Sequence, residues 1–220
     1  MDAGLLGGLP DGDRRVVLGS THRRRYARGE SVFHEDDPAD TVHFVAEGHL
    51  AVRRSTSAGD SVTFSILGPG DAFGEMAMLS AGARRTSTVI ALEPAVTLGL
   101  SFAEFQRLRS LHPGVERLFV DMLAERVRRL SDHLVEALHV PVDQRVVRRL
   151  SALCESYGPA DQAVPVTVPL TQTDIGDLAG ASRPATNRVL RGLAADGLVV
   201  LHRGSVEVRD RVALARRASP

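Results

Sequence analysis

The chain has 220 residues, enough for two domains, and its 43% apolar and 25% charged residues are ordinary for a globular protein. Its net charge of zero does not exclude a nucleic-acid partner, because 16 Arg and 19 acidic residues fall in 1–140, and 11 Arg and 8 acidic residues in 141–220. The single cysteine, Cys154, excludes an internal disulfide and a four-thiolate iron–sulfur cluster. Without a signal-peptide pattern or an apolar run of about 18 residues, we expect a cytoplasmic protein that has no membrane partner.

From Arg23 to Leu100, short runs rich in β-branched residues alternate with clusters of turn formers. This spacing predicts an antiparallel sandwich or barrel. The expected strands are Thr41–Val45, His49–Val52, Ser61–Leu67, Thr86–Ala91 and Ala95–Leu100, with turns at Glu47-Gly48, Ala58-Gly59-Asp60, Gly68-Pro69-Gly70-Asp71 and Glu93-Pro94.

At Phe102 the period changes to that of helices. A short helix is expected to end near His112-Pro113, and a longer one to run over about 113–139. The longer helix carries apolar residues at steps of four and three, namely Leu123, Val127, Leu130, Leu134 and Ala137. Such a heptad seam favours a homodimer that pairs two of these helices, and the alternative is a seam packed on the chain's own β domain.

Pro141 ends the long helix and marks a hinge over Val140–Val142. Beyond the hinge, two further short helices are expected between Val168 and Leu198. The other expected elements are a helix over Asp143–Glu155, a loop over Tyr157–Gln162, a strand over Val164–Val168, and a hairpin of Leu198–Leu201 and Val206–Val208 around Arg203-Gly204-Ser205.

The first of the two short helices begins at Thr171-Gln172-Thr173-Asp174, which has the form of a capping box. Gly180 stands where a tight turn between the helices needs a residue that tolerates positive φ. Ser182 is expected to cap the second helix, with Pro184 inside its first turn, where a missing N–H costs nothing.

The second of these helices is amphipathic when residues are placed at about 100° each. Thr186, Val189, Leu190 and Leu193 fall on its apolar arc, and the opposite arc holds Arg183, Pro184, Asn187, Arg188 and Arg191. A guanidinium-rich face of this kind suits the major groove of double-stranded DNA, where Arg pairs two N–H groups with guanine. The alternative is an ordinary solvated basic face; the paired helices, the Gly turn and the Arg203 hairpin favour DNA.

A second set of residues indicates an anion site in the β-rich region. Gly74 would let the backbone approach a ligand closely, and a short helix that opens there offers N–H groups to an anion. Arg85 is suited to neutralise a phosphodiester, Glu75 to accept a hydrogen bond from a sugar hydroxyl, and the Thr86 and Ser87 hydroxyls to donate nearby. The alternative is that Arg85 and Glu75 form a structural ion pair.

The run TQTDIGDLAGASRPATNRVLRGLAADGL that follows Leu170 resembles the winged helix-turn-helix of the CRP/FNR superfamily of bacterial regulators, and the resemblance extends over nearly the whole chain. It implies an α+β fold in three parts: a double-stranded β-helix (jelly-roll-like) effector domain over 1–112, a dimerisation helix and hinge over 113–140, and a winged helix-turn-helix over 141–220. RNA polymerase is implied as a further partner. The DNA-contacting residues are then Thr171, Ser182, Arg183, Pro184, Asn187, Arg188, Arg191 and Arg203. Pro184 departs from the pattern, because cyclic-AMP receptors carry a base-reading Glu there, so their operator is not assumed.

Gly74-Glu75 and Arg85-Thr86-Ser87 are similar to the phosphate-binding cassette of cyclic-nucleotide-binding domains. The resemblance implies cAMP, or less favoured cGMP, as an allosteric effector. It adds Arg126 and Ser131 near the base, although Leu130 replaces a Thr that contacts adenine. A regulator that is constitutive or senses another effector stays open.

No nucleophile or phosphate-loop motif is present, so we expect neither an enzyme nor catalytic residues. We also expect no covalent cofactor and no metal site. His34-Glu35-Asp36-Asp37 is interpreted as a charged turn rather than a metal cluster, because its spacing fits no zinc motif.

Overall fold

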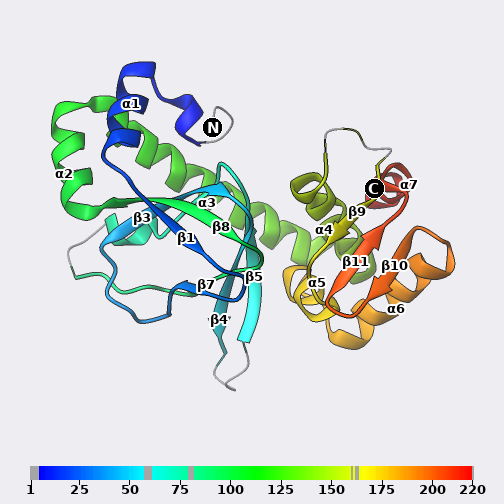
Figure 1. Ribbon diagram of the computed structural model, residues 1–220. Coiled ribbons are helices and arrows are strands. Elements are labelled where there is room, and N and C mark those ends of the chain that lie inside the picture. The colour runs from blue at the N-terminus through cyan, green and yellow to red at the C-terminus, as the bar shows by residue number, and fades with distance from the viewer. Residues whose placement is uncertain (1–4, 57–60, 79–81, 160, 162–163, 220) are drawn as a thin grey trace. The chain divides into compact units, whose positions relative to one another are not determined.

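The computed structural model describes residues 5–56, 61–78, 82–159, 161 and 164–219. The turn expected at Ala58-Gly59-Asp60 and the end of the loop over Tyr157–Gln162 lie outside the described residues. The expected α+β organisation is confirmed: a β-rich region is followed by a long helix and a winged helix-turn-helix (Figure 1). The chain divides into two compact units, residues 1–130 and 131–220, each of which is described by itself.

The first unit consists of two antiparallel four-stranded sheets with helices before and after them. Their strand orders are β1-β8-β3-β6 and β2-β7-β4-β5. The elements are η1 (Leu5–Gly8), α1 (Asp11–Gly19), β1 (His22–Tyr26), β2 (Ser31–Phe33), β3 (Thr41–Glu47), β4 (Leu50–Ser55), β5 (Ser61–Leu67), β6 (Ala72–Phe73), η2 (Glu75–Met78), β7 (Thr88–Ala91), β8 (Ala95–Ser101), α2 (Phe102–Leu111) and the start of α3 (Pro113–His139).

Two apolar cores hold this unit together. One includes Leu50, Val52, Phe73 and Val89, which come from both sheets. The other joins β3 and β8 to the helices, and its members include Val17, Leu100, Leu108, Val115 and Met122. Partly buried and fully buried residues alternate along β7, which is the period-2 pattern that identified strands in the sequence.

The predicted strands β3, β4, β5, β7 and β8 are all present, with bounds shifted by at most three residues. The expected strand over Thr86–Ala91 begins only at Thr88, since Thr86 and Ser87 lie in the preceding loop. Several elements were not predicted individually, namely η1, α1, β1, β2, β6 and the C-terminal helix α7. The strands β2 and β6 have three and two residues, too few to show a period.

The second unit contains a three-stranded antiparallel sheet, ordered β10-β11-β9, and a group of helices. Its elements after the end of α3 are α4 (Val142–Tyr157), β9 (Val166–Val168), α5 (Gln172–Leu178), α6 (Arg183–Ala195), β10 (Val199–His202), β11 (Ser205–Val208) and α7 (Arg211–Ala218). The helix, strand, helix pair and hairpin expected beyond Pro141 are therefore present. No helix in the described residues is long and apolar enough to cross a bilayer.

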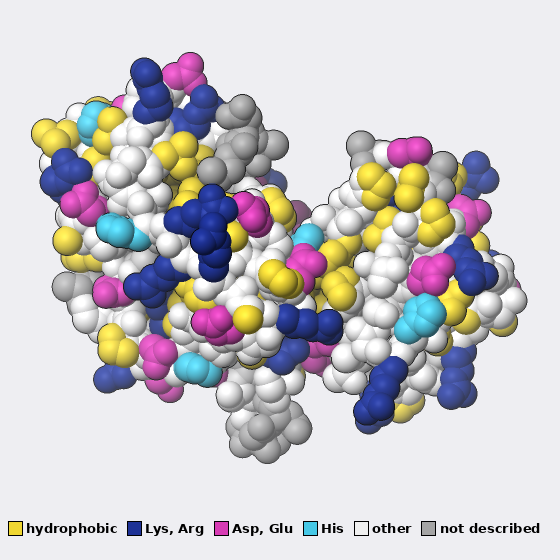
Figure 2. Space-filling view, in the orientation of Figure 1, with side chains coloured by type: hydrophobic (Ala, Val, Ile, Leu, Met, Phe, Trp, Pro, Cys, Tyr) yellow, Lys and Arg dark blue, Asp and Glu magenta, His cyan; other side chains and the backbone are white. Residues whose placement is uncertain are grey.

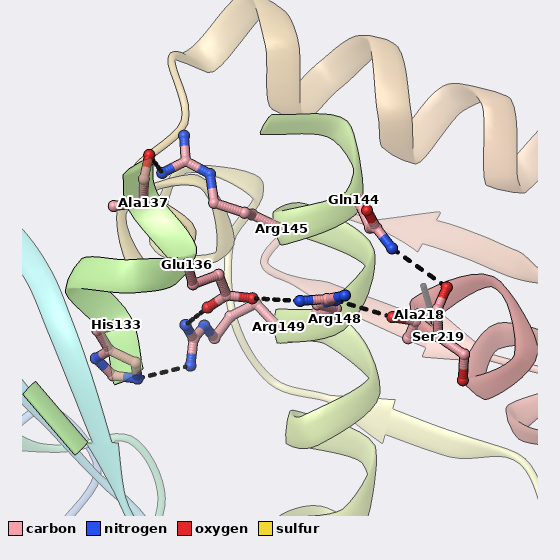
Figure 3. A network of polar contacts seen from close by, with 9 residues as sticks. All are labelled: His133, Glu136, Ala137, Gln144, Arg145, Arg148, Arg149, Ala218 and Ser219. Carbon is pink, nitrogen blue, oxygen red and sulfur yellow. Dashed lines mark hydrogen bonds and ion pairs between the residues drawn. The ribbon is translucent and has the colours of Figure 1, made fainter. Parts of the chain in front are cut away.

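Polar contacts join the last turns of α3 to α4 across the Pro141 break (Figure 3). The carboxylate of Glu136 accepts a hydrogen bond from Arg149 at 3.0 Å and lies 3.8 Å from Arg148. Arg145 donates to the backbone oxygens of Ala137 at 3.5 Å and of Gly180 at 3.2 Å. The expected hinge over Val140–Val142 is therefore bridged by side chains on both sides.

Helices α5 and α6 approach each other at Gly176, which is buried. A Cβ at Gly176 would lie 2.6 Å from the Thr186 hydroxyl, whereas a Cβ at Gly192, also helical, meets no described atom within 4 Å. We predict that Gly176→Ala lowers the free energy of unfolding by about 1–3 kcal/mol, because the helices must separate. Gly192→Ala is the matched control and should raise it by up to about 1 kcal/mol through helix propensity. Urea denaturation measures both, and equal shifts would contradict the packing argument.

Candidate functional sites

A cavity in the first unit brings together six of the seven predicted ligand-binding residues. Its free volume is about 40 Å³, and it opens to solvent. Gly74, Glu75, Arg85, Thr86, Ser87 and Arg126 all line it. Ser131, the seventh, is exposed on α3 and does not line this cavity.

Arg85 is the central charged group of this cavity, and its side chain is only 6% exposed. Its Nη1 donates to the backbone oxygens of Thr41 at 2.8 Å and of Gly74 at 3.4 Å. Its buried Nε has no hydrogen-bond partner in the part of the chain that the structure describes. Among the described residues no carboxylate lies within ion-pair distance of Arg85. The alternative interpretation, a structural ion pair between Arg85 and Glu75, is therefore not observed.

The charge of Arg85 is strongly desolvated. Burial lowers the pKa of this guanidinium, whereas the more distant carboxylates of Asp40, Asp37 and Glu75 raise it. A buried charge that lacks a close counter-ion is unfavourable unless a partner arrives. Arg85 therefore brings a cation to the wall of the cavity, and its Nε is unpaired among the described residues.

Gly74 has a φ of +77°, a backbone conformation that favours glycine. A Cβ at this position would lie 2.6 Å from Arg85 Nη1 and 3.0 Å from the Thr41 oxygen. The absence of a Cβ at Gly74 therefore allows the Arg85 guanidinium to approach the backbone. The sequence had suggested a different reason for this glycine, namely the close approach of a ligand. The 3₁₀ helix η2 begins at the next residue, Glu75, and is a single turn.

An aromatic cluster that was not predicted from the sequence lies against Arg85. The guanidinium carbon lies 4.0 Å from the centroid of the Phe33 ring. Phe33 in turn contacts Phe73 and His43, with centroid distances of 5.8 and 6.0 Å. Burial, followed by the charge of Arg85, lowers the pKa of His43 to about 3, so this imidazole is neutral at pH 7.

The segment His34-Glu35-Asp36-Asp37 lies in the connection between β2 and β3. The Asp37 carboxylate accepts a hydrogen bond from the backbone N–H of His34 at 2.7 Å, as in a turn. No group of three potential metal ligands gathers anywhere in the described part of the chain.

The predicted capping box at the start of α5 is confirmed. Thr171 Oγ1 accepts from the Asp174 N–H at 3.1 Å, and the Asp174 carboxylate accepts from the Thr171 N–H at 3.0 Å. Gly180 has the positive φ expected of the turn, at +58°.

The prediction that the Ser182 hydroxyl caps α6 is wrong. Ser182 is the N-cap residue, but its side chain makes no capping hydrogen bond to the described residues of the helix. A capping hydroxyl usually accepts a hydrogen bond from the backbone N–H of the second or third helical residue. The second helical residue here is Pro184, which has no N–H, so one of these two donors is missing.

The two arcs predicted for α6 are present. Thr186, Leu190 and Leu193 are buried and Val189 is partly buried, whereas Arg183, Pro184, Arg188 and Arg191 are exposed. Asn187 is half-buried and donates to Gln172 Oε1 at 2.8 Å. Thr171, Ser182 and Arg203 lie at the ends of elements in the same unit, Arg203 at the turn of the β10–β11 hairpin. In the view of Figure 2, Arg side chains reach the surface in both units and are interspersed with acidic ones.

Arg188 on this exposed face already has a partner. Its guanidinium contacts the carboxylate of Asp143, in the first turn of α4, at 2.6 Å. Their side chains are 67% and 54% exposed, so the pair is solvated and weak. Asp143 lies 45 residues from Arg188, and its role was not predicted from the sequence.

The heptad seam of α3 is largely uncovered within the chain. Val127, Leu130 and Leu134 are 54–63% exposed, as are further apolar residues of this helix, Val120, Val135 and Leu138, at 57–69%. Leu123 is partly buried and Ala137 is exposed. The alternative that the seam packs on the chain's own β domain therefore does not hold for the exposed residues.

Comparison with known proteins agrees with this division of the chain. Residues 23–112 match the cyclic nucleotide-binding domain family, and residues 144–217 match the Crp-like helix-turn-helix domain. The chain is 33% identical over 198 residues to the CRP-like cAMP-activated global transcriptional regulator of Mycobacterium tuberculosis, covering 88% of this chain and 86% of that one. It is 32% identical over 211 residues to the cyclic AMP receptor protein of Thermus thermophilus, with coverages of 96% and 94%. Among solved structures it is similar to the c-di-GMP responsive global regulator CLP of Xanthomonas campestris, with a TM-score of 0.71, 25% identity, and coverage of 90% and 99%.

We predict that Asp143→Asn strengthens binding to duplex DNA by about 2- to 5-fold, because it releases Arg188 from a competing carboxylate. Arg188→Ala should weaken binding by about 1–3 kcal/mol if this residue pairs with a base. Fluorescence anisotropy with duplexes selected in vitro measures both at fixed salt.

A double-mutant cycle separates this ion pair from a general charge effect. In the Arg188→Ala background, Asp143→Asn should no longer change DNA affinity. The control Asp196→Asn removes another carboxylate of this unit, one that pairs with Arg217 at 2.7 Å. A gain from Asp143→Asn that survives the loss of Arg188 would contradict the role of the pair.

Proposed function

Because the chain belongs to the CRP/FNR superfamily of bacterial transcriptional regulators, which are DNA-binding proteins rather than enzymes, we propose that it is a homodimer gated by a cyclic nucleotide. The nucleotide binds in the cavity around Arg85, and the dimer binds a palindromic operator through α6. The observation that carries the sensing half is the buried Arg85 side chain, which lacks a carboxylate partner among the described residues and lines a cavity that is open to solvent.

The lining of the cavity supports a cyclic phosphodiester as the ligand. The one negative charge of such a ligand matches Arg85, whose hydrogen bonds to the described chain use Nη1 and leave Nε unpaired. Glu75, Thr86 and Ser87 line the cavity, and we assign Glu75 to accept from a ribose hydroxyl and the two hydroxyls to donate to the phosphate. Arg126 of α3 lines the same cavity and is assigned to the base side of the ligand.

Cyclic AMP is the favoured effector, with cGMP second. The names of the two relatives at 32–33% identity, which refer to cAMP, support this choice. Leu130 stands where cyclic-AMP receptors carry an adenine-contacting Thr, and Arg84-Arg85-Thr86 is similar to the Arg-Arg-Thr of cyclic-GMP-binding domains, so cGMP is the second candidate. A regulator that is constitutive or responds to another effector is the alternative, and the c-di-GMP responsive regulator CLP is a similar protein with a different effector.

The exposed seam on α3 supports a homodimer. Apolar side chains that are more than half exposed at heptad spacing are costly in water, and pairing with a second copy of the helix removes them from solvent. A dimer also presents two copies of α6, which two half-sites of a palindromic operator require. The ligand gates DNA binding only insofar as it prefers the DNA-competent state.

Arg85→Gln should abolish binding of cAMP and cGMP, because it removes the cation that neutralises the phosphodiester. Isothermal titration calorimetry measures the affinity, and urea denaturation checks that the variant is folded. Wild-type affinity in a folded Arg85→Gln protein would contradict the assigned pocket. No heat with either nucleotide at millimolar concentration in the wild type would remove the sensing proposal and leave the DNA-binding function standing.

Leu134→Asp should convert the dimer to a monomer, because it places a charge in the apolar seam. Sedimentation velocity at micromolar concentration measures the assembly state. Val212→Asp is the matched control: Val212 is a 40% exposed apolar residue on α7, outside the seam, and its replacement should leave the dimer intact. A wild-type protein that sediments as a monomer with and without nucleotide would overturn the dimer.

A further inference from the structure

The wall of the effector cavity contains an aromatic ring for which neither family match gives a role. Phe33 lines the cavity and lies face-on to the guanidinium of Arg85, with Cζ 4.0 Å from the ring centroid. The ring is fixed from behind, because Phe73 and His43 pack against it and His43 stacks on Phe73 at 5.1 Å. Its backbone belongs to β2, which pairs with β7 at Val89.

Two contacts of different kinds hold the guanidinium. The carbonyl oxygens of Thr41 and Gly74 accept hydrogen bonds from its Nη1 end. The Phe33 ring lies 4.0 Å from its Cζ and attracts the cation electrostatically, more strongly where the cation is desolvated, as Arg85 is. The hydrogen bonds fix only the Nη1 end, and the ring adds a second point of contact at Cζ. The guanidinium is therefore held at two points in the free protein.

We propose that Phe33 is a positioning residue for the effector: its ring holds Arg85 in the orientation that receives a phosphodiester before the ligand arrives. Preorganisation of this kind raises affinity, because the ordering cost of the Arg85 side chain is met in the free protein. This proposal rests on the proposed function for the identity of the ligand. The contact between Phe33 and Arg85 itself is present in the protein without a ligand.

The competing explanation is that Phe33 only fills the core. Phe64 provides the matched control, since it is also half-buried and packs on the same apolar core, from β5, but does not line the cavity. Phe33→Leu keeps an apolar side chain and removes the aromatic face. Phe33→Tyr keeps the face and tests for rescue.

The first experiment titrates the full chain and its variants with cAMP and cGMP by calorimetry. Phe33→Leu should weaken binding by roughly 5- to 30-fold, the range of a cation–π contact at a desolvated site. Phe33→Tyr should stay within about 3-fold of wild type, and Phe64→Leu should not change the affinity although both Leu variants shift the urea midpoint. Equal losses for Phe33→Leu and Phe64→Leu, or no rescue by Tyr, would overturn the proposal.

The second experiment needs no ligand. Urea midpoints are measured for Phe33→Leu, Arg85→Gln and the double variant, which form a cycle. The shift caused by Phe33→Leu should be clearly smaller when Arg85 is already Gln, because the cation has gone. Additive shifts overturn the proposal even in a protein that binds no cyclic nucleotide. A wild type that binds neither nucleotide overturns the proposed effector, while the cycle still decides the role of Phe33.

Discussion

The burial of the Arg85 charge is the physical constraint on which the cavity of the first unit depends. The backbone of this residue exchanges hydrogen bonds with Asp36 and Asp37, while its side chain reaches Thr41 and Gly74. Three separate segments are thereby held against one residue. The close hydrogen-bond acceptors of this charge are neutral carbonyls, and no carboxylate among the described residues pairs with it. An anion in the cavity would supply that missing partner, which agrees with the proposed effector site.

The DNA-reading half was the more predictable part, because its determinants are local in sequence. The arcs of α6 follow from 3.6-residue periodicity, and its buried face holds Thr186, Leu190 and Leu193 as expected. The capping box at Thr171 and Asp174 spans only three residues. Patterns of this length are set by backbone geometry and depend little on the rest of the chain.

The features that the sequence did not reveal depend on contacts between distant residues. Nothing in the run Ser31–Phe33 indicates that Phe33 faces the guanidinium of Arg85, and β2 is too short to show which side chains point inward. Asp143 is likewise an ordinary first-turn acidic residue until the fold places Arg188 beside it. Ser182 shows the opposite failure, in which a valid local rule was overridden by a neighbour, because Pro184 removes a backbone donor.

The break at Pro141, where a hinge is predicted, interrupts the helix without separating the elements on its two sides. Proline ends the hydrogen-bond ladder there, but Arg145 reaches back to Ala137 and Arg149 to Glu136, so the last turns of α3 are tied to α4 (Figure 3). Arg145 also reaches Gly180, in the turn between α5 and α6. These side chains therefore connect the end of α3 both to α4 and to the turn of the helix-turn-helix. The Glu136 carboxylate, which contacts both Arg148 and Arg149 of α4, holds two of these cations near the end of α3.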